Sequence, residues 1–321
     1  MPRVLVVLAL LLLAIPAAAQ ERLTVTSQYG PDKPQTQLWV RFAEIVEAER
    51  PGAYDLDIVP SGALGGEKEE AEAVRLGAIT GALSTVANLT TWVPEGAVLD
   101  LPFAFSGREH IARVTGGEVG EALRRAYREE GFAAPAFIVF GARHLISDAP
   151  LTDPGDVSGL TMRVLQSDLH VALWRSLGAA PTALPITEAY TALSNGVVEA
   201  MDLTKSGYEA LKLYEVAPVL TETAHIWAIG VVYFDAAFWD GLPEEDRALF
   251  ARAAEEAARH FDRLAEAEQE AALARAVAKG ARLAQVDPTP WQTAVAGFVD
   301  DYAATLPAAA RDALEAIRAT R

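Results

Sequence analysis

The chain has 321 residues, of which 51% are hydrophobic and 22% charged, a composition typical of a globular protein long enough for two hydrophobic cores. Its formal net charge of −17 argues against nucleic acids and anionic membrane surfaces as partners. It contains no cysteine, which excludes disulfides, thiol chemistry and thiolate metal sites. Because the overall charge repels anions, an acidic ligand would need a local positive site.

The first residues have the pattern of a signal peptide. Arg3 precedes an apolar run from Val4 to Ile15, and Pro16-Ala17-Ala18-Ala19 supplies small residues before a cleavage point. The run is too short for a comfortable membrane span. We therefore expect residues 1–19 to be removed by cleavage near Ala19 and the mature protein to be exported.

Strand and helix patterns alternate through the next part of the chain. Strands are expected at 23–28, 55–59 and 79–83, with helices at 38–49 and 67–76 between them. This order predicts a doubly wound, mostly parallel sheet. The glycines at 62, 65 and 66 lack the spacing of a phosphate-binding loop, so we interpret them as a loop at the edge of a cleft.

Two apolar runs, at 132–140 and 226–234, are typical of strands buried on both faces. Between them the sequence predicts strands near Met162, at 182–184 and at 198–202, each followed by a helical pattern. We interpret the two runs as crossover strands that link two lobes, with a hinge between the lobes.

A long helix is expected after the second run. Leu242-Pro243-Glu244 is a strong helix start, and nothing in the sequence interrupts the helix before Lys279-Gly280. Roughly 37 residues correspond to about 55 Å, enough to lie across both lobes. A last strand at 282–286 and two helices that begin near Thr289 and Pro307 complete the chain.

Arg163 is the first candidate for a functional residue. Residues 160–164 alternate as a short strand, so Arg163 lies near the end of a strand in a βα unit, beside the loop in which open α/β sheets bind ligands. Its planar guanidinium matches a carboxylate bidentately. A surface position, or a pairing with a structural acid, is the alternative interpretation.

The sequence offers no catalytic or metal-binding motif. Its five histidines lack the spacing of paired metal ligands, and there is neither a nucleophile elbow nor a dinucleotide-binding fingerprint. We therefore expect no metal and no cofactor, and the interpretation as an enzyme has no motif to support it.

The motifs around Arg163, taken in order, resemble the solute-binding proteins of TRAP (tripartite ATP-independent periplasmic) transporters. They comprise residues 141–147, 177–181 and 188–200, with Leu64-Gly65-Gly66-Glu67 and Asp100-Leu101-Pro102-Phe103 upstream. The resemblance implies a two-lobed α/β fold like that of type II periplasmic binding proteins. In that fold, two mixed, mostly parallel sheets are joined by crossover strands and by a long domain-spanning helix. We assign residues 20–138 and 226–260 to lobe I, and residues 139–225 and 261–321 to lobe II.

The resemblance also implies a binding site between the lobes. In the family, the arginine that matches Arg163 forms the main salt bridge to the carboxylate of the solute. Arg143 matches a second arginine that can contact the ligand, with an internal salt bridge as the alternative. The remaining candidates fall where the lobes are expected to face each other: Gln28, Tyr29, Ser84, Thr85, Trp92, Gln166 and Asp202.

The sequence departs from the family at Leu203. Many members have Asp-Gly-x-Glu-Asn-Pro after the corresponding strand, and the Asn contacts the ligand, whereas this chain has Leu203 at that position. Leucine offers apolar contact but cannot satisfy a ligand hydroxyl. We therefore include Leu203 in the site and expect a more apolar pocket, with Asp202, Thr204 or Lys205 as the replacement for the lost amide.

The interpretation that the sequence favours is a periplasmic receptor that binds an organic acid between two lobes and passes it to a TRAP membrane permease. Two alternatives share the same site. One is a periplasmic enzyme that acts on a small acid, for which turnover of the bound acid would be the evidence. The other is a ligand sensor for a membrane receptor kinase, for which a neighbouring kinase gene would be the evidence.

Overall fold

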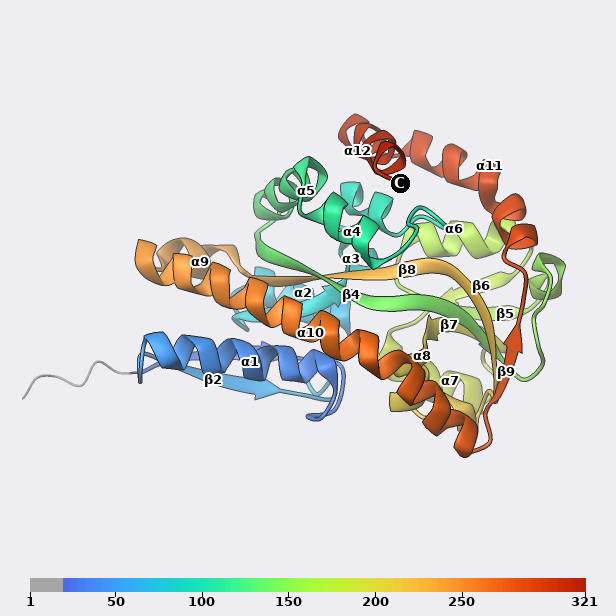
Figure 1. Cartoon of the computed structure of the whole chain (residues 1–321), viewed down its shortest axis with the longest axis horizontal. Coiled ribbons are helices and arrows are strands. Elements are labelled where there is room, and N and C mark those ends of the chain that lie inside the picture. Colours follow the sequence, from blue (N-terminus) through green and yellow to red (C-terminus); the bar gives the residue numbers. More distant parts are fainter. Residues whose placement is uncertain (1–19) are drawn as a thin grey trace, which may run out of the picture.

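The computed structural model describes residues 20–321, and the expected signal peptide at 1–19 lies outside the described residues. The described chain is an α/β protein in which helices cover an extended sheet with one half of the molecule at each end (Figure 1). Within residues 20–321, no helix is both long enough and apolar enough to cross a membrane.

The first half follows the order that the sequence predicted. Its elements are β1 (Glu21–Thr26), α1 (Pro34–Glu49), β2 (Tyr54–Val59), α2 (Glu67–Arg75), β3 (Gly81–Thr85), α3 (Val86–Leu89), the 3₁₀ turn η1 (Pro94–Leu99), α4 (Arg108–Thr115) and α5 (Glu118–Glu129). Strands β2, β1 and β3 are parallel neighbours. The short elements α3 and η1 were not predicted, because four to six residues are too few to display a helical period.

The apolar face of α1 shows why the first half is compact. Leu38, Phe42 and Val46 recur at helical spacing and are buried. Phe42 lies 5.4 Å from Phe234 between ring centroids and 5.2 Å from Phe250, in an edge-to-face contact with the latter. This aromatic cluster holds the N-terminal helix against segments that are about 200 residues later in the sequence.

The second half is a βα series with short strands. Its elements are η2 (Pro154–Val157), β5 (Thr161–Val164), α6 (Asp168–Ser176), β6 (Ala180–Ala183), η3 (Ile186–Glu188), α7 (Ala189–Ser194), β7 (Ala200–Thr204), α8 (Lys205–Ala210), η4 (Leu213–Glu215) and β9 (Arg282–Gln285). Strand β5 pairs in parallel with both β6 and β7. The predicted βα order of this half is confirmed.

Two long antiparallel strands, β4 (Phe132–Ser147) and β8 (Val219–Asp235), run through both halves. They contain the two predicted crossover runs but are longer, because the continuation of β4 includes the polar Arg143 and His144 and so lacks an apolar signature. Strand β8 pairs with β3, and β4 pairs with β7. The two expected sheets are therefore the two ends of one nine-stranded sheet, ordered β2-β1-β3-β8-β4-β7-β5-β6, with β9 beside β8.

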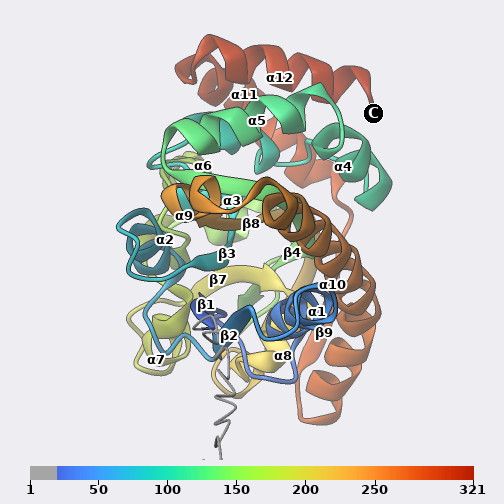
Figure 2. The ribbon, with the colours of Figure 1, turned by 90° about the vertical axis from the view of Figure 1, so that its left-hand side faces the viewer.

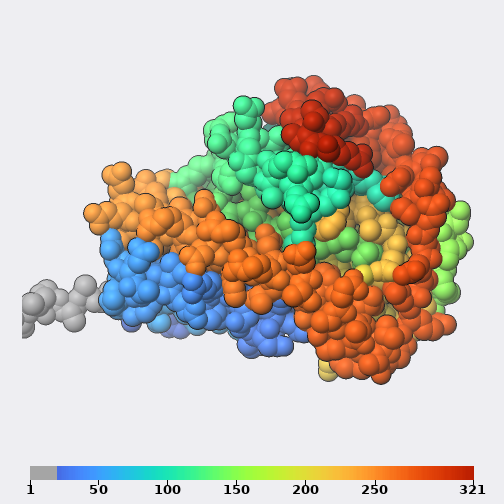
Figure 3. Space-filling model, in the orientation of Figure 1, coloured from blue at the N-terminus to red at the C-terminus, as the bar shows by residue number. Residues whose placement is uncertain are grey.

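Helix α10 (Glu244–Ala278) crosses the molecule from one half to the other (Figures 1 and 3). Phe250 and Phe261 pack in the core that contains α1, whereas Leu273 and Ala276 pack in the core of the second half. Its 35 residues match the predicted domain-spanning helix, and the short α9 (Ala236–Gly241) precedes it.

The C-terminal helices α11 (Thr289–Thr305) and α12 (Ala308–Ala319) pack on different halves. Trp291 of α11 joins the core around Trp174 of the second half. Leu314 and Ile317 of α12 are buried in the first-half core with Val98 of η1. Figure 2 shows α12 stacked over α5, and Figure 1 shows α11 over the side of the molecule that contains α6. The C-terminal segment thus connects the two halves a third time, in addition to the β4–β8 pair and α10.

Candidate anion-binding site

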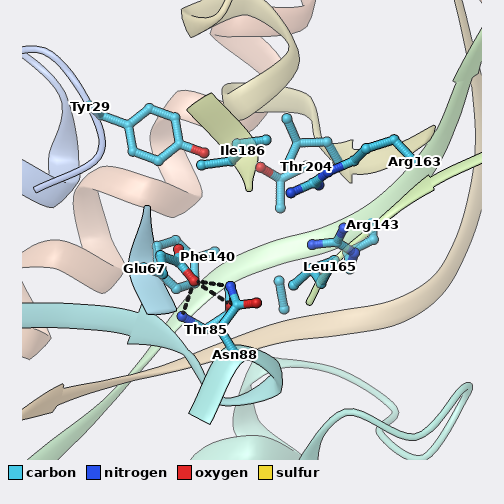
Figure 4. A pocket seen from close by; sticks show the side chains of 12 residues that line it. Tyr29, Glu67, Thr85, Asn88, Phe140, Arg143, Arg163, Leu165, Ile186 and Thr204 are labelled. Atoms are coloured by element: carbon cyan, nitrogen blue, oxygen red, sulfur yellow. Dashed lines mark hydrogen bonds between the residues drawn. The ribbon is translucent and has the colours of Figure 1, made fainter. Parts of the chain in front are cut away.

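A small cavity lies between the two halves, where the C-terminal ends of β1, β3, β5 and β7 face one another across the crossover strands (Figure 4). Its free volume of about 30 Å³ leaves room for only one or two water molecules. Its lining consists of Tyr29, Glu67, Thr85, Asn88, Phe140, Arg143, Arg163, Leu165, Ile186, Leu203, Thr204 and Ala228. A larger ligand therefore requires the halves to move apart before it enters.

Arg163 is positioned at the cavity by β5. Its side chain is 2% exposed, and its Nε donates to the carbonyl oxygen of Leu184 at 2.9 Å. Within residues 20–321 no carboxylate lies within ion-pair distance of this guanidinium. Burial, together with the charge of Arg143, lowers the pKa of Arg163 to about 10, so the group remains protonated at neutral pH. A buried charge without a counterion is costly, and an anionic ligand would remove that cost.

Arg143 is anchored from behind by Asp202. Its Nε donates to Oδ2 of Asp202 at 2.6 Å, and its Nη2 donates to Oδ1 at 3.0 Å and to the main-chain oxygen of Asp202 at 2.8 Å. Burial alone would raise the pKa of Asp202, but the charge of Arg143 and a hydrogen bond from His225 hold it well below its usual range. The internal salt bridge that the sequence left as an alternative is present, and it leaves Nη1 of Arg143 for a ligand.

His225 completes the support of Arg143. Its Nε2 lies 3.1 Å from Oδ2 of Asp202, and its Nδ1 lies 2.7 Å from the hydroxyl of Thr223. Burial lowers the pKa of His225, so the ring is neutral at pH 7 and carries one proton. The carboxylate of Asp202 requires a donor, which places that proton on Nε2 and leaves Nδ1 to accept from Thr223.

The opposite wall is built around Glu67 at the start of α2. Its Oε2 accepts hydrogen bonds from the main-chain nitrogen of Thr85 at 3.0 Å, from the hydroxyl of Thr85 at 2.6 Å and from the side-chain amide of Asn88 (Figure 4). The negative group also benefits from the positive end of the α2 dipole. Glu67 and the two arginines therefore stand on opposite sides of the cavity.

The rest of the lining is mostly apolar. Phe140, Leu165, Ile186, Leu203 and Ala228 contribute to the cavity walls. Tyr29 points its hydroxyl toward the centre of the cavity, and burial raises its pKa above its usual value (Figure 4). Of the groups considered as substitutes for the missing amide, Thr204 lines the cavity, whereas Lys205 pairs with Glu222 and with Glu270 at 2.7 Å outside it.

Five of the predicted site residues lie outside the cavity. Ser84 points to the other face of β3 from Thr85 and hydrogen-bonds to the hydroxyl of Tyr233 at 2.7 Å, because successive strand residues alternate between faces. Trp92 packs on Phe132 in the first-half core, with ring centroids 5.8 Å apart. The structure therefore places these two side chains outside the cavity lining, in the packing of the first half.

The other three residues lie outside the cavity lining for separate reasons. Gln28 donates to the carbonyl oxygen of Gly65 at 3.0 Å and so braces the loop before α2. Asp202 is fully buried and engaged by Arg143 and His225, so it supports the site from behind. Gln166 is half-buried beyond β5 and does not contribute to the lining.

The sequence interpretation missed Glu67 and Asn88 as site residues. Glu67 entered the sequence analysis only as the last residue of a family motif and the first of a predicted helix, although its position directly after a glycine-rich loop at the cleft edge was the available signal. Phe140, Leu165, Ile186 and Ala228 carry no signal, because an apolar residue that lines a cavity has the same sequence pattern as one that fills a core.

A two-lobed α/β fold with two crossover strands is typical of solute receptors, and so is a buried arginine that lines a cavity between the lobes and has no carboxylate partner among residues 20–321. The family described as bacterial extracellular solute-binding protein, family 7, matches residues 25–305. The chain belongs to this family, whose members include the solute receptors of TRAP transporters. These proteins are extracytoplasmic binding proteins rather than enzymes.

Two curated relatives and two solved structures illustrate the similarity. The C4-dicarboxylate-binding periplasmic protein DctP of Rhodobacter capsulatus is 32% identical over 265 residues, which cover 82% of this chain and 80% of the relative. A solute-binding protein of Verminephrobacter eiseniae is 31% identical over 244 residues, which cover 76% of this chain and 73% of the relative.

Among the structures, a TRAP periplasmic solute binding protein from Roseobacter denitrificans with bound β-D-glucuronate has a TM-score of 0.90 and 27% identity. The match covers 94% of this chain and all of that one. A Bradyrhizobium protein in complex with α/β-D-galacturonate has a TM-score of 0.89 and 28% identity. That match covers 92% of this chain and 99% of the Bradyrhizobium chain. Both ligands are acids held by the same fold.

Proposed function

We propose that this chain is a periplasmic receptor that binds an organic acid between its two lobes and delivers it to a TRAP membrane permease. The observation that carries the proposal is Arg163, a buried guanidinium that lines the cavity and has no carboxylate partner among residues 20–321. A carboxylate ligand would pair with it bidentately, and Nη1 of Arg143 would contribute a further donor.

The relatives support the same class of ligand. The Rhodobacter capsulatus relative is named for C4-dicarboxylates, and the Roseobacter and Bradyrhizobium structures hold uronates. All of these ligands are carboxylates, but they differ in size and in polar substituents. The class of ligand follows from Arg163, whereas its identity depends on the rest of the lining.

Binding would be coupled to a hinge motion. The β4–β8 ladder has register shifts between Val139 and Gly141 and between Arg143 and Leu145, beside the cavity. Bulges of this kind bend strands locally, so they are suitable places for a hinge. We propose that lobe I (20–138 and 226–260) and lobe II (139–225 and 261–321) move about this point. Helix α12 is the exception within the range of lobe II, because it packs on η1 and would move with lobe I.

A thermal-shift screen of organic acids, followed by calorimetry, tests the proposal. We expect at least one carboxylate to bind in the micromolar range or tighter and the corresponding uncharged amide not to bind. Consumption of the bound acid would favour the enzyme instead. Uptake of that acid by vesicles that contain the permease, only when the receptor is added, tests the partner. N-terminal sequencing of the exported protein tests cleavage near Ala19.

A further inference from the structure

The two walls of the cavity differ in hydrogen-bonding character. On the second-half side, Arg163 and Arg143 can only donate. On the first-half side, Thr85 and Asn88 have already used their donors, because the nitrogen and hydroxyl of Thr85 and the amide nitrogen of Asn88 all bond to Glu67. The hydroxyl of Tyr29, which can both donate and accept, is the remaining polar hydrogen on this side of the described lining. Beside Tyr29, what this side offers to a ligand is therefore the acceptor oxygens of Glu67 and Asn88.

Two observations show that these acceptors are incompletely satisfied. Glu67 has no lysine, arginine or histidine as an ion-pair partner among residues 20–321, although it is only 9% exposed. The side-chain oxygen of Asn88 is buried and has no hydrogen-bond partner within the same described residues. Buried acceptors without donors are costly, and a ligand that brings a donor would satisfy them.

We propose that the ligand is a monocarboxylate that carries a hydrogen-bond donor, a hydroxyl or an ammonium group, at the end opposite to its carboxylate. This inference rests on the proposed function and names the ligand class for the same cavity. The carboxylate pairs with Arg163, the donor bonds to Glu67 and Asn88, and the apolar wall of Phe140, Leu165 and Ile186 contacts the carbon chain. A dicarboxylate of the same length places its second carboxylate against Glu67 and is disfavoured by like-charge repulsion.

Calorimetry with four matched series of acids tests the proposal on the wild-type protein: hydroxy acids, amino acids, methyl-terminated acids and dicarboxylates. The shortest members of the four series are 4-hydroxybutyrate, 4-aminobutyrate, pentanoate and succinate. Their homologues with one and two added methylenes are measured in the same way. We expect the tightest hydroxy or amino acid to bind at least about tenfold more tightly than the dicarboxylate and the methyl-terminated acid of its length. The hydroxy and amino arms distinguish the two sources of the donor.

A charge-neutral variant reverses the expected order. Glu67→Gln keeps an oxygen for Thr85 and adds an amide donor, so it should strengthen dicarboxylate binding and weaken the binding of the amino acid. The exposed neighbour on α2 provides the matched control, because Glu69→Gln removes the same charge outside the cavity.

The outcomes separate this inference from the proposed function. Wild-type binding of a dicarboxylate as tight as that of the best hydroxy or amino acid overturns the inference and leaves the receptor function intact. Failure of every acid in all four series and in the wider screen to bind contradicts the receptor function as well. If Glu67→Gln does not fold, the wild-type series alone decides.

Discussion

The ammonium of Lys33 lies 3.2 Å from a carboxylate oxygen of Glu209, and this contact joins the loop before α1 in the first half to α8 in the second. Glu209 also receives Lys279 at 3.2 Å and Arg275 at 3.3 Å, while Lys33 lies 3.4 Å from Glu268 of α10. Burial alone would raise the pKa of Glu209, but hydrogen bonds from Arg275, Lys279 and Lys33 lower it to about 2. Lys33 is the first-half member of this cluster, so the proposed opening of the lobes would break its contacts.

We expect Lys33→Gln to weaken ligand binding by about fivefold, mainly through faster dissociation. A partly buried ion pair of this kind contributes about 1 kcal/mol to the closed form, and ligand release requires opening. Stopped-flow kinetics and calorimetry measure the effect, and small-angle scattering should show a larger radius of gyration for the liganded variant than for liganded wild type. Lys212→Gln is the control, since Lys212 is exposed on the second half and makes no ion pair within the described residues. An unchanged dissociation rate in Lys33→Gln would contradict this role.

Much of the fold was accessible from the sequence because its signals are local. The long uninterrupted helix, the two apolar crossover runs and the βα alternation each depend on residues that are near one another in the chain. The position of Arg163 was accessible for the same reason, since a short strand and a following helix locate it. Asp202 illustrates the limit, because its pairing with Arg143 depends on the register between β4 and β7. The contact of Lys33 with Glu209 joins residues 176 positions apart, and no local pattern indicates it.

Replacement of Arg163 should separate binding from stability. We expect Arg163→Lys to lose about 2–5 kcal/mol of binding free energy, because an ammonium cannot reproduce a bidentate contact with a carboxylate. Thermal unfolding of the free protein should change little, because Arg163 makes one hydrogen bond, to Leu184, and no ion pair among residues 20–321. Arg175→Lys on the exposed face of α6 is the matched control. An affinity within about threefold of wild type would show that Arg163 does not hold the ligand.

Glu70 should make the stability of the protein depend on pH. Its side chain is fully buried, Oε1 accepts from the hydroxyl of Thr26 at 2.5 Å, and Oε2 has no partner among residues 20–321. Burial raises the pKa of Glu70 to about 7. Between the ordinary value of about 4.5 and this value the folded state binds more protons than the unfolded state, so stability falls as the pH rises through that range.

We therefore expect Glu70→Gln to stabilise the protein at pH 8 and to have little effect at pH 4.5. Glutamine resembles the protonated carboxyl, so it avoids the cost of ionising a buried group at high pH. The gain in the free energy of unfolding is at most about 3 kcal/mol, which is the free-energy equivalent of the difference between the folded and unfolded pKa values. Thermal unfolding curves from pH 4 to pH 8 measure it, with Glu69→Gln as the exposed control on the same helix. Equal shifts at both ends of the pH range would mean that Glu70 is already ionised in the folded protein.

Leu203 should determine where on the ligand a hydroxyl is tolerated. It lines the cavity, is 6% exposed and packs against the backbone of Gly207 at the start of α8, so its side chain has little freedom to turn away. A ligand hydroxyl placed against it would be left without a partner, at a cost of about 1–3 kcal/mol, whereas a methylene there gains apolar contact.

We expect Leu203→Asn to improve binding of an acid with a hydroxyl at that carbon and to weaken binding of the acid without it. Calorimetry on acids that differ only by one hydroxyl, placed in turn at each carbon, locates the position. If Leu203→Asn leaves the ratio of the two affinities unchanged at every carbon, then Leu203 does not contact the ligand, and the apolar character of the cavity must be assigned to its other apolar lining residues, such as Leu165 and Ile186.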